Sequence, residues 1–214
     1  MNLFKVLAVT FVSENTFVLR VERPHVLIKA GQCFNVGVPG SGINREYSMY
    51  SGAQDPFLEF LIRKVAQGAV SCKLGALSPG DFVEIDGPYG EFCLAEPVDE
   101  KQHYFFLGTG TGIAPFHSFV RTYPNIRYTL LHGIRFADER YGAEDYIEGS
   151  YMPCISRNTD GKESCRLTDR LRSVVTFENT HAYLCGNRSM IIDAFDILRD
   201  CGFPADNIFT EVFF

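Results

Sequence analysis

The chain has 214 residues, of which 46% are hydrophobic and 21% are charged, and its formal net charge is −6. This composition is typical of a soluble globular protein with one large domain or two of roughly 100 residues, and the acidic charge argues against a nucleic-acid-binding surface. No apolar run approaches the ~20 residues of a membrane span and the first residues lack a signal-peptide pattern, so we expect neither feature.

The seven cysteines are predicted to be reduced thiols of a cytoplasmic protein. Their number is odd and none forms a C-x-x-C pair, so their spacing supports neither a disulfide framework nor a zinc or iron–sulfur site. The five histidines are scattered and form no H-x-x-x-H pair. We therefore expect no metal centre.

The first half of the chain is predicted to form an antiparallel β-barrel or sandwich. Segments with a β-type pattern are separated by turn residues every ~8–12 residues, which is the spacing of all-β domains. The predicted strands span residues 4–12, 16–21, 32–38, 46–51, 57–65 and 81–85, with a short helix at 69–77.

The segment Arg45-Glu46-Tyr47-Ser48 is distinctive within this half. On a strand, alternation places Arg45 and Tyr47 on one face and Ser48 on the other. An arginine beside an aromatic ring suits a ligand that carries both a phosphate and a planar ring system. The alternative is an ordinary strand with an exposed arginine, which the residues alone favour.

The second half of the chain is predicted to be an α/β domain with a parallel sheet. A polar connector at residues 96–102 precedes it, so we predict one domain at 1–98 and another at 99–214. Strands then alternate with helices, which implies a parallel sheet with helices on both faces. The predicted strands are 104–107, 127–132, 151–156, 182–185 and 208–213, and the predicted helices begin at 113, 167 and 190.

The first turn of this α/β half is predicted to bind phosphate. Gly108, Gly110 and Gly112 follow a buried strand and precede a helix, so bare backbone N–H groups and the helix dipole favour an anion. The spacing is G-x-G-x-G-x-x-P rather than G-x-G-x-x-G, and the next strand ends in His132-Gly133 without an acidic residue for a ribose. The turn is therefore not of the ordinary NAD type; the alternative is a tight βα turn that is merely rich in glycine.

Two arginines are placed to select the coenzyme. Ser156 and Arg157 end the third strand of the sheet, at the edge where open α/β sheets bind ligands, and Arg166 follows nine residues later. Arginine matches a phosphate through its planar fork of donors. The alternative is a solvated loop arginine. Cys185 also ends a strand at this edge, and as an isolated cysteine it would be a buried small apolar residue.

Three elements of the first half resemble the flavin-binding signature of the ferredoxin–NADP reductase family. They are Arg45-x-Tyr47-Ser48, the G-x-x-S segment Gly68-Ala69-Val70-Ser71, and a G-P-x-G-x-F loop at residues 87–92. The resemblance implies an FAD-binding antiparallel β-barrel. It also implies that Arg45 holds the FAD pyrophosphate, that Tyr47 stacks on the isoalloxazine, and that the Ser48 hydroxyl approaches flavin N5.

The second half resembles the same family at two places, the pyridine-nucleotide loop 108–115 and the C-G-N segment 185–187. This implies a Rossmann-like domain for NADP(H), with Arg157 and Arg166 on the 2′-phosphate and Cys185 against the nicotinamide. The C-terminus resembles members whose terminal aromatic covers the flavin, which implies that Phe213 stacks on the isoalloxazine and Phe214 extends toward the adenine of FAD.

The resemblance implies two sets of cofactor-binding residues. The FAD set is Arg45, Glu46, Tyr47, Ser48, Gly68, Ala69, Val70, Ser71, Phe213 and Phe214. The NADP(H) set is Gly108, Thr109, Gly110, Thr111, Gly112, Ser156, Arg157, Arg166, Cys185, Gly186 and Asn187. Catalytic roles fall to Ser48, Cys185, Glu211 and Phe213, the role of Glu211 being an influence on protonation.

The implied activity is hydride transfer between NADPH and FAD, followed by one-electron exchange with ferredoxin or flavodoxin. One alternative is a reductase component of a multicomponent oxygenase, or a flavin or quinone reductase on the same scaffold. An alternative of another class is an electron-transfer or regulatory subunit without turnover, which would bind nucleotide without reducing ferricyanide.

Overall fold

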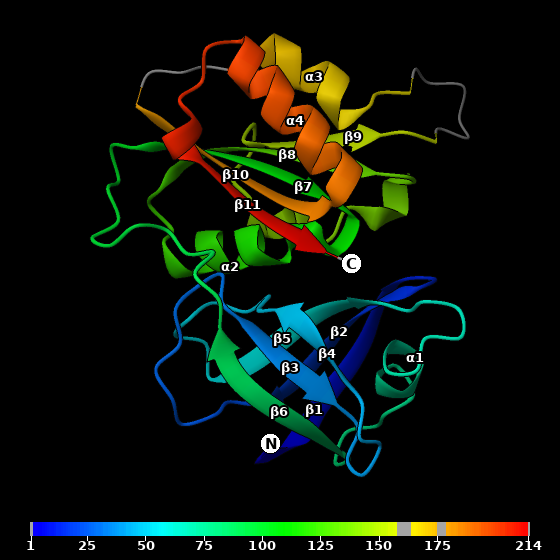
Figure 1. The fold of residues 1–214 in the computed structure, drawn as a ribbon. Helices are drawn as coiled ribbons and strands as arrows, with labels where there is room; N and C mark the ends of the chain where they lie inside the picture. The colour runs from blue at the N-terminus through cyan, green and yellow to red at the C-terminus, as the bar shows by residue number, and fades with distance from the viewer. Residues whose placement is uncertain (1, 158–163, 175–178, 214) are drawn as a thin grey trace. The chain divides into compact units, whose positions relative to one another are not determined.

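The computed structural model describes residues 2–157, 164–174 and 179–213, and the chain divides into two compact units (Figure 1). The first unit comprises Met1–Leu94 together with His117–Thr122, and the second comprises Ala95–Phe116 and Tyr123–Phe214.

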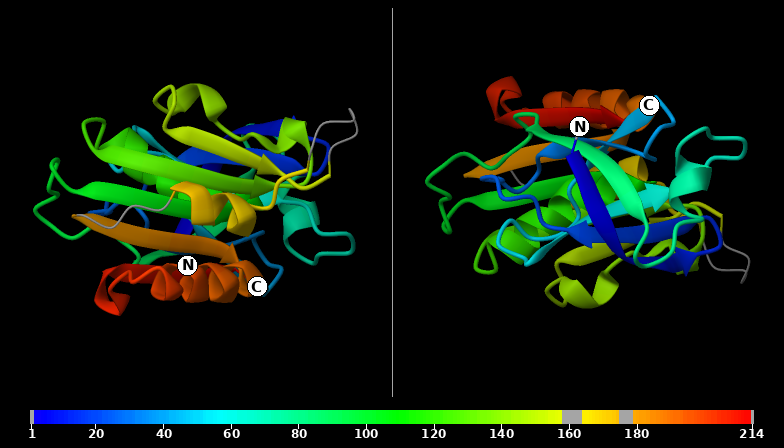
Figure 2. Two further views of the ribbon diagram at one scale, coloured as in Figure 1. Left: turned by 90° about the horizontal axis from the view of Figure 1, so that it is seen from above. Right: turned by 90° about the horizontal axis from the view of Figure 1, so that it is seen from below.

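The first unit is an antiparallel barrel, whose strands cross in the right-hand view of Figure 2. Its elements are β1 (Asn2–Ser13), β2 (Thr16–Glu22), β3 (Cys33–Gly37), β4 (Asn44–Ser48), β5 (Phe57–Arg63), α1 (Ser71–Leu74) and β6 (Phe82–Tyr89). The strand order is β4-β3-β6-β1-β2-β5, and an antiparallel bridge between Met49 and Phe60 joins the two outer strands. The sheet is therefore closed on itself.

Alternating side chains fill the interior of this barrel. Phe17, Leu19 and Val21 of β2 are completely buried, and so are Phe60 and Ile62 of the neighbouring β5. A period of two places these residues on one face of each strand, so closing the sheet buries both rows against each other.

The second unit is a five-stranded parallel sheet with the order β11-β10-β7-β8-β9. Its strands are β7 (His103–Thr109), β8 (Arg127–Ile134), β9 (Tyr151–Ile155), β10 (Thr180–Asn187) and β11 (Ile208–Phe213). Its helices are α3 (Leu167–Val174) and α4 (Arg188–Asp200), and α2 (Ala114–Thr122) begins in it, although the residues of α2 from His117 onward are grouped with the first unit. Short 3₁₀ turns lie at Gly110–Ile113, Ala137–Glu139, Ala143–Asp145 and Ala205–Asn207.

Helices cover both faces of the parallel sheet, as predicted. On one face, Leu107 of β7 and Leu184 of β10 pack with Leu171 of α3 and Ala194 of α4 in a single buried cluster. On the other face, aromatic rings stack, with Phe106 of β7 lying 4.9 Å from the ring of Phe116 at the start of α2. The predicted fold class, a barrel followed by a parallel α/β domain, is confirmed.

Several predicted elements differ in length from those observed, among them α1, β6 and β10. The helix predicted at 69–77 is the single turn α1, because the chain leaves the helix at Gly75, where a Cβ would lie 3.0 Å from the ring of Phe17. Strand β6 continues beyond the predicted end at 85 and pairs Tyr89 with Cys33, with a register shift on β3. Strand β10 extends the predicted 182–185 at both ends.

Candidate active site

The glycine turn lies at the point where the strand order of the parallel sheet reverses. From β7 the chain moves to β8 and β9 on one side, and later returns to β10 and β11 on the other. Open α/β sheets bind ligands outside the carboxyl ends of the strands at this reversal. Residues 110–113 form a 3₁₀ turn that leads directly into α2, with Pro115 in its first turn as predicted.

Gly112 in the turn and Gly186 in β10 let these two segments approach closely, whereas Gly110 leaves one side of the turn open. A Cβ atom on Gly112 would lie 2.6 Å from the Cys185 carbonyl oxygen and 2.7 Å from the Gly186 Cα, so no other residue fits there without movement. Gly186 has φ +124°, and a Cβ on it would overlap Thr109. Gly110 has φ +55° and no atom lies within 4 Å of its Cβ position, so this side of the turn is open. The turn therefore fits a phosphate that approaches the bare backbone.

Hydrogen bonds fasten the turn to its neighbouring strands. The Thr109 Oγ1 accepts a hydrogen bond of 2.9 Å from the backbone N–H of Asn187. The His132 Nε2 of β8 lies 2.8 Å from the carbonyl oxygen of Gly110, and the His132 Nδ1 lies 2.9 Å from the Tyr151 hydroxyl of β9. Sequence reasoning missed this histidine contact, for which the available signal was a lone polar residue at the end of an apolar strand.

Strand register brings the predicted nicotinamide residues together. Cys185 pairs with Gly108 of β7 on one side and with Glu211 of β11 on the other. The Cys185 side chain is completely buried, and its thiol donates a hydrogen bond of 3.6 Å to the Glu211 carboxylate. Burial, and secondarily the Glu211 charge, raise the pKa of the Cys185 thiol well above its usual value. A protonated thiol suits packing rather than nucleophilic attack.

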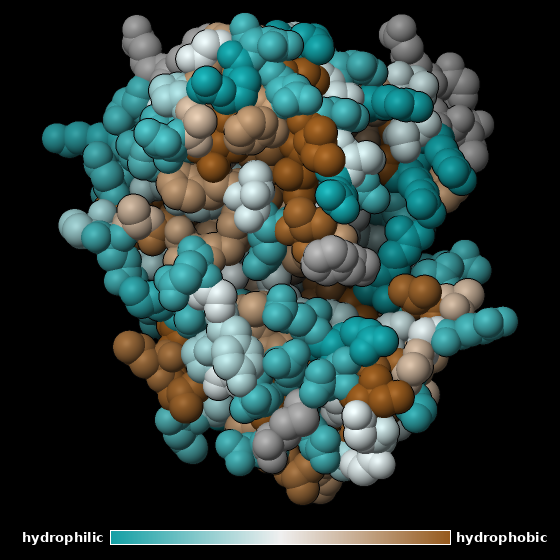
Figure 3. Space-filling view, in the orientation of Figure 1, coloured by the Kyte–Doolittle hydropathy of each residue, from teal (hydrophilic) through white to brown (hydrophobic). Residues whose placement is uncertain are grey.

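Other residues of the predicted C-G-N segment and C-terminus have visible structural roles. The Asn187 side chain caps α4 by accepting a hydrogen bond of 2.9 Å from the Ser189 N–H. Phe213 pairs with Asn187, is half-buried, and ends the edge strand β11. Ile192 of α4 is half-exposed, and Figure 3 shows hydrophobic residues on the surface in the region of β11 and α4. Phe214 lies outside the described residues.

Of the residues predicted to select the coenzyme, Ser156 and Arg157 follow the end of β9 at the carboxyl edge of the sheet, and Arg166 directly precedes α3, next to Cys165, whose N–H bonds the Ile155 carbonyl oxygen at 2.9 Å. Ser156 and Arg157 continue the pairing with β8 through backbone hydrogen bonds of 2.9 Å to the carbonyl oxygens of residues 134 and 135. The Ser156 hydroxyl donates to the carbonyl oxygen of Ile134 at 3.1 Å. Arg157 and Arg166 are both exposed. Their side chains are therefore accessible to a phosphate in solution.

The predicted flavin segment forms β4 of the barrel. Arg45 and Glu46 are exposed, Tyr47 is half-buried and Ser48 is buried. The Arg45 guanidinium donates a hydrogen bond of 2.8 Å to the carbonyl oxygen of Asn44. Burial raises the pKa of the Tyr47 phenol to about 12, so this ring is neutral at physiological pH. A cation and a partly covered ring therefore share one face of β4.

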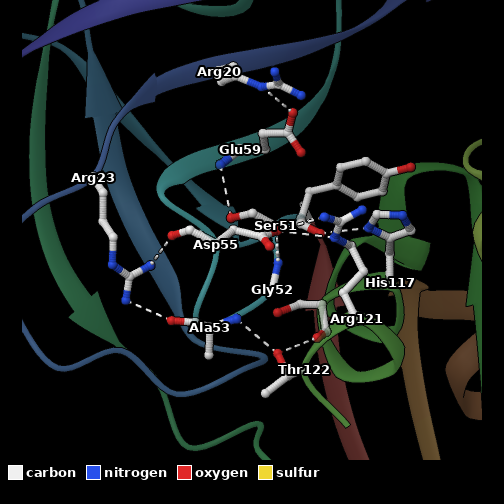
Figure 4. Close-up of polar contacts among 12 residues, drawn as sticks. Arg20, Arg23, Ser51, Gly52, Ala53, Asp55, Glu59, His117, Arg121 and Thr122 are labelled. Atoms are coloured by element: carbon white, nitrogen blue, oxygen red, sulfur yellow. Dashed lines mark hydrogen bonds and ion pairs between the residues drawn. The ribbon is translucent and has the colours of Figure 1, made fainter. Parts of the chain in front are cut away.

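The segment after β4 is fixed by a network of polar contacts, drawn in Figure 4. The Ser51 hydroxyl accepts a hydrogen bond of 3.1 Å from the Glu59 N–H, and the Ala53 N–H donates to the Thr122 hydroxyl at 2.8 Å. Arg23 donates to the carbonyl oxygen of Ala53 at 2.7 Å. His117 stacks on Tyr50 with ring centroids 3.7 Å apart. Ser51 thus has a structural role, and the network holds the exit of β4 in place.

The G-x-x-S segment forms the turn between β5 and α1. The Ser71 hydroxyl is buried and accepts a hydrogen bond of 3.1 Å from the Val65 N–H, and a Cβ on Gly68 would lie 2.7 Å from that hydroxyl oxygen. Ala69 is exposed and Val70 is buried. Because Met49 bridges Phe60 in an antiparallel sense, β4 begins beside the end of β5 from which this turn departs. Both flavin segments therefore belong to one end of the barrel.

Within the part of the chain that the structure describes, none of the helices is both long and apolar enough to cross a membrane. Across these same residues, no group of three or more histidine, cysteine, aspartate or glutamate side chains is arranged to hold a metal ion.

Comparisons with known proteins agree with this architecture. Residues 3–93 match the family model described as an oxidoreductase FAD-binding domain. The ferredoxin–NADP reductase of Azotobacter vinelandii is 28% identical, over 94% of this chain and 90% of that protein. The aromatic O-demethylase reductase subunit of an Amycolatopsis species is 34% identical over 62% of this chain, but the match spans only 44% of that longer protein.

Among solved structures, a ferredoxin NADP+ reductase from Neisseria gonorrhoeae with bound FAD and NADP is similar over 100% of this chain and 98% of that chain. Its TM-score is 0.88 and its sequence identity is 25%. The barrel therefore matches an FAD-binding domain of oxidoreductases, and the chain as a whole, with its parallel sheet and glycine turn, is similar in sequence and structure to ferredoxin–NADP reductases over nearly its full length.

Proposed function

We propose that this protein transfers hydride between NADPH and a bound FAD and exchanges single electrons with a ferredoxin or a flavodoxin. The observation that carries the proposal is the open glycine turn at the switch point of the sheet, with two exposed arginines on the same carboxyl edge. Such a turn accepts the pyrophosphate of a dinucleotide, and the arginines accept a further phosphate. The seven free cysteines are consistent with a cytoplasmic location.

The residues of the first unit fit FAD. Arg45 provides an exposed cation for the pyrophosphate, and Tyr47 provides a ring on the same face for stacking. The buried Ser48 hydroxyl can direct a hydrogen bond toward the flavin edge. Gly68 lacks the side chain that would overlap Ser71, so the backbone of residues 68–71 can come close to a phosphate. Bound FAD would supply the redox chemistry, since a flavin exchanges one or two electrons.

The residues of the second unit favour NADPH over NADH. Strand β8 ends at His132-Gly133-Ile134, without a carboxylate to hold an unphosphorylated ribose. Ser156, Arg157 and Arg166 instead offer a hydroxyl and two guanidinium groups at the end of β9. A guanidinium binds a phosphate through two parallel hydrogen bonds, so these residues favour the 2′-phosphate of NADPH.

At the nicotinamide end, the chain's own residues align and shield the reacting rings. The protonated Cys185 packs at the end of β10, and its hydrogen bond fixes the Glu211 carboxylate beside it. Phe213, at the end of the edge strand, is the residue that would stack on the flavin ring. Holding the rings in register lowers the entropic part of the barrier to hydride transfer.

A second candidate function is a reductase component that feeds an oxygenase. The 34% identity with the Amycolatopsis reductase subunit favours it, although this chain corresponds to less than half of that protein. Both candidates share hydride transfer from NADPH to FAD and differ in the protein that receives the electrons. A regulatory subunit without turnover would bind the coenzyme without reducing an artificial acceptor.

The test is the steady-state reduction of ferricyanide by the FAD-loaded protein with NADPH and with NADH. We expect turnover with a preference for NADPH. Replacing Arg157 with alanine should lower kcat/KM for NADPH by roughly 10- to 150-fold, the effect of losing one hydrogen bond to a charged group, and should leave kcat/KM for NADH unchanged. The control is Arg172→Ala, which removes an exposed arginine of α3. An unchanged coenzyme ratio in Arg157→Ala would remove the phosphate role, and absence of turnover would remove the enzyme assignment.

A further inference from the structure

His132 is a buried polar residue at the glycine turn to which the proposed function assigns no task. It lies on β8 opposite Gly108 and is completely buried. Its Nε2 lies 2.8 Å from the Gly110 carbonyl oxygen, and its Nδ1 lies 2.9 Å from the Tyr151 hydroxyl. Both ring nitrogens therefore have partners, and one partner belongs to the turn itself.

The two contacts determine which nitrogen carries the proton. Burial lowers the pKa of the His132 imidazole to about 4, so the ring is neutral at physiological pH and carries one N–H. A backbone carbonyl only accepts hydrogen bonds, so Nε2 must be the donor to Gly110. Nδ1 is then an acceptor, and the Tyr151 hydroxyl donates to it. The Gly110 carbonyl thereby selects the tautomer, and Tyr151 gives the other ring nitrogen its partner.

The bond to Gly110 also sets the direction of the next backbone N–H. In a planar trans peptide the carbonyl oxygen and the following N–H point in opposite directions. His132 draws the Gly110 carbonyl toward the interior, so the Thr111 N–H points away from it, toward the open side of the turn. The first N–H groups of a helical turn have no partner within that turn, so this N–H is available to a ligand.

We propose that His132 is a positioning residue for the coenzyme pyrophosphate: through the Gly110 carbonyl it holds the turn so that the Thr111 N–H faces the phosphate. The proposal rests on the proposed function, because the phosphate is that of NADPH. Gly110 has φ +55° and no side chain to fix its peptide, so an external hydrogen bond is needed to define the peptide's orientation. Tyr151 supports the arrangement from β9.

The test compares two replacements of similar length. A glutamine at 132 keeps both functions, since its amide N–H can donate to Gly110 and its carbonyl oxygen can accept from Tyr151. A methionine fills similar space but provides no N–H donor. We expect His132→Met to weaken NADP+ binding, measured by calorimetry, about 2- to 12-fold, the range for loss of one neutral hydrogen bond, and His132→Gln to remain within twofold of wild type.

The ratio of kcat/KM for NADPH to kcat/KM for NADH separates the role of His132 from that of Arg157. NADPH and NADH share the pyrophosphate, so His132→Met should raise KM for both by the same factor, leaving their ratio, kcat and the FAD content unchanged. Nitrogen NMR of the wild-type imidazole should show a proton on Nε2 and none on Nδ1, and Tyr151→Phe should leave the proton on Nε2 because the Gly110 carbonyl still requires a donor.

The outcomes that would overturn the inference can be told apart. If His132→Met and His132→Gln lose thermal stability while their affinities for NADP+ stay at the wild-type value, His132 only fills the core and the inference falls. If affinity falls equally in both variants, the donor is not the cause, and the inference also falls. If the wild-type protein binds neither coenzyme, the proposed function fails. If the wild type binds NADP+ and His132→Met binds it equally well, the inference about His132 falls while the proposed function stands.

Discussion

At the scale of single residues, burial sets the protonation states around the glycine turn. The pKa of the His132 imidazole is lowered to about 4 and the pKa of the Cys185 thiol is raised, in both cases because the charged form is poorly solvated. Both groups are consequently neutral near pH 7. Their effect on a ligand comes from hydrogen bonds and packing rather than from charge.

This neutrality predicts a pH dependence of stability. The imidazole pKa is about 4 in the folded protein and about 6.5 in the unfolded chain, so between these values only the unfolded chain is protonated at His132. The contribution of His132 to the free energy of unfolding should therefore be fully present above pH 6.5, and the free energy of unfolding should fall by up to ~3 kcal/mol as the pH drops toward 4. The titratable groups whose rings face the imidazole are Tyr141 and Tyr151, which stay neutral in this range.

The measurement is urea unfolding of wild type and His132→Gln at several pH values. Other histidines and the carboxylates titrate in both proteins, so the difference between the two curves isolates residue 132. We expect that difference to shrink as the pH falls. Parallel curves would contradict a depressed pKa at His132.

The sequence indicated candidate site residues through short local motifs, such as Arg45, Tyr47 and the glycines of the turn, and their roles stay predictions. It did not predict His132, because the contact with Gly110 depends on the register between β7 and β8, and no local pattern encodes that register. The role of Ser51 likewise depends on a neighbouring strand, since its buried hydroxyl accepts a hydrogen bond from the backbone N–H of Glu59 on β5.

At the scale of elements, the edge strand β11 is held by ring stacking and by pairing with β10. Phe209 stacks on Tyr183 with ring centroids 4.6 Å apart, and the strand pairs with β10 along its length. Residue 213 forms the last pair of this register, opposite Asn187. Removing the residues after Val212 should therefore leave the strand in place.

We predict that deleting residues 213 and 214 tightens NADP+ binding and strengthens a long-wavelength absorption band of flavin–nicotinamide charge transfer. The nicotinamide would no longer have to displace an aromatic ring from the flavin. Titration with NADP+ followed by visible absorbance measures both effects. The control is Phe209→Leu, which should lower Tm without changing NADP+ affinity. Identical spectra for wild type and the truncated protein would mean that the tail is purely structural.

The period of the hydrophobic residues predicted whether a segment is a helix or a strand. The length of each element depended on the segments that pack against it or pair with it. The parallel strands were recognised because they are buried on both faces and alternate with helical patterns. The pattern at 69–77 predicted a helix, but only Ser71–Leu74 is helical, since Gly75 packs against Phe17 of β2. Strand β6 passes through Gly87-Pro88, which the sequence indicated as a turn, because pairing with β3 continues to Tyr89.

At the scale of the whole molecule, the net charge is unevenly divided. The first unit contains nine basic and nine acidic residues, whereas the second contains eleven basic and seventeen acidic ones. The whole net charge of −6 therefore belongs to the second unit. An acidic redox protein would be repelled by the second unit and would dock more readily on the first.

The basic residues of the first unit lie at different ends of the barrel strands. Arg63 pairs with Thr16 at one end of the β2–β5 ladder, followed by Lys64, and α1 with Lys73 packs beside Val65. Lys5 lies near the other end of the barrel strands, where its neighbour Val6 pairs with Val21. Arg63, Lys64 and Lys73 thus adjoin the Gly68–Ser71 segment, which we propose to contact FAD.

We predict that an acidic ferredoxin or flavodoxin docks on these three residues. Replacing Lys73 with glutamate should lower the rate of electron transfer to such a partner on the order of 10-fold at low salt, with the difference shrinking as salt screens the charges. Reduction of an uncharged quinone should not change. The matched control is Lys5→Glu, an exposed lysine of the same unit. Equal rates for the two variants would place the partner elsewhere.

The close contact of Gly112 with residues 185 and 186 has an evolutionary consequence. Any side chain at 112 or 186 would collide with backbone or with Thr109, so the part of the site proposed to hold the shared pyrophosphate is closed to substitution. Arg157 and Arg166 are exposed and can be exchanged without repacking the core. Under the proposed function, descendants of this chain can therefore drift between coenzymes at two surface positions while the ability to bind a dinucleotide is inherited intact.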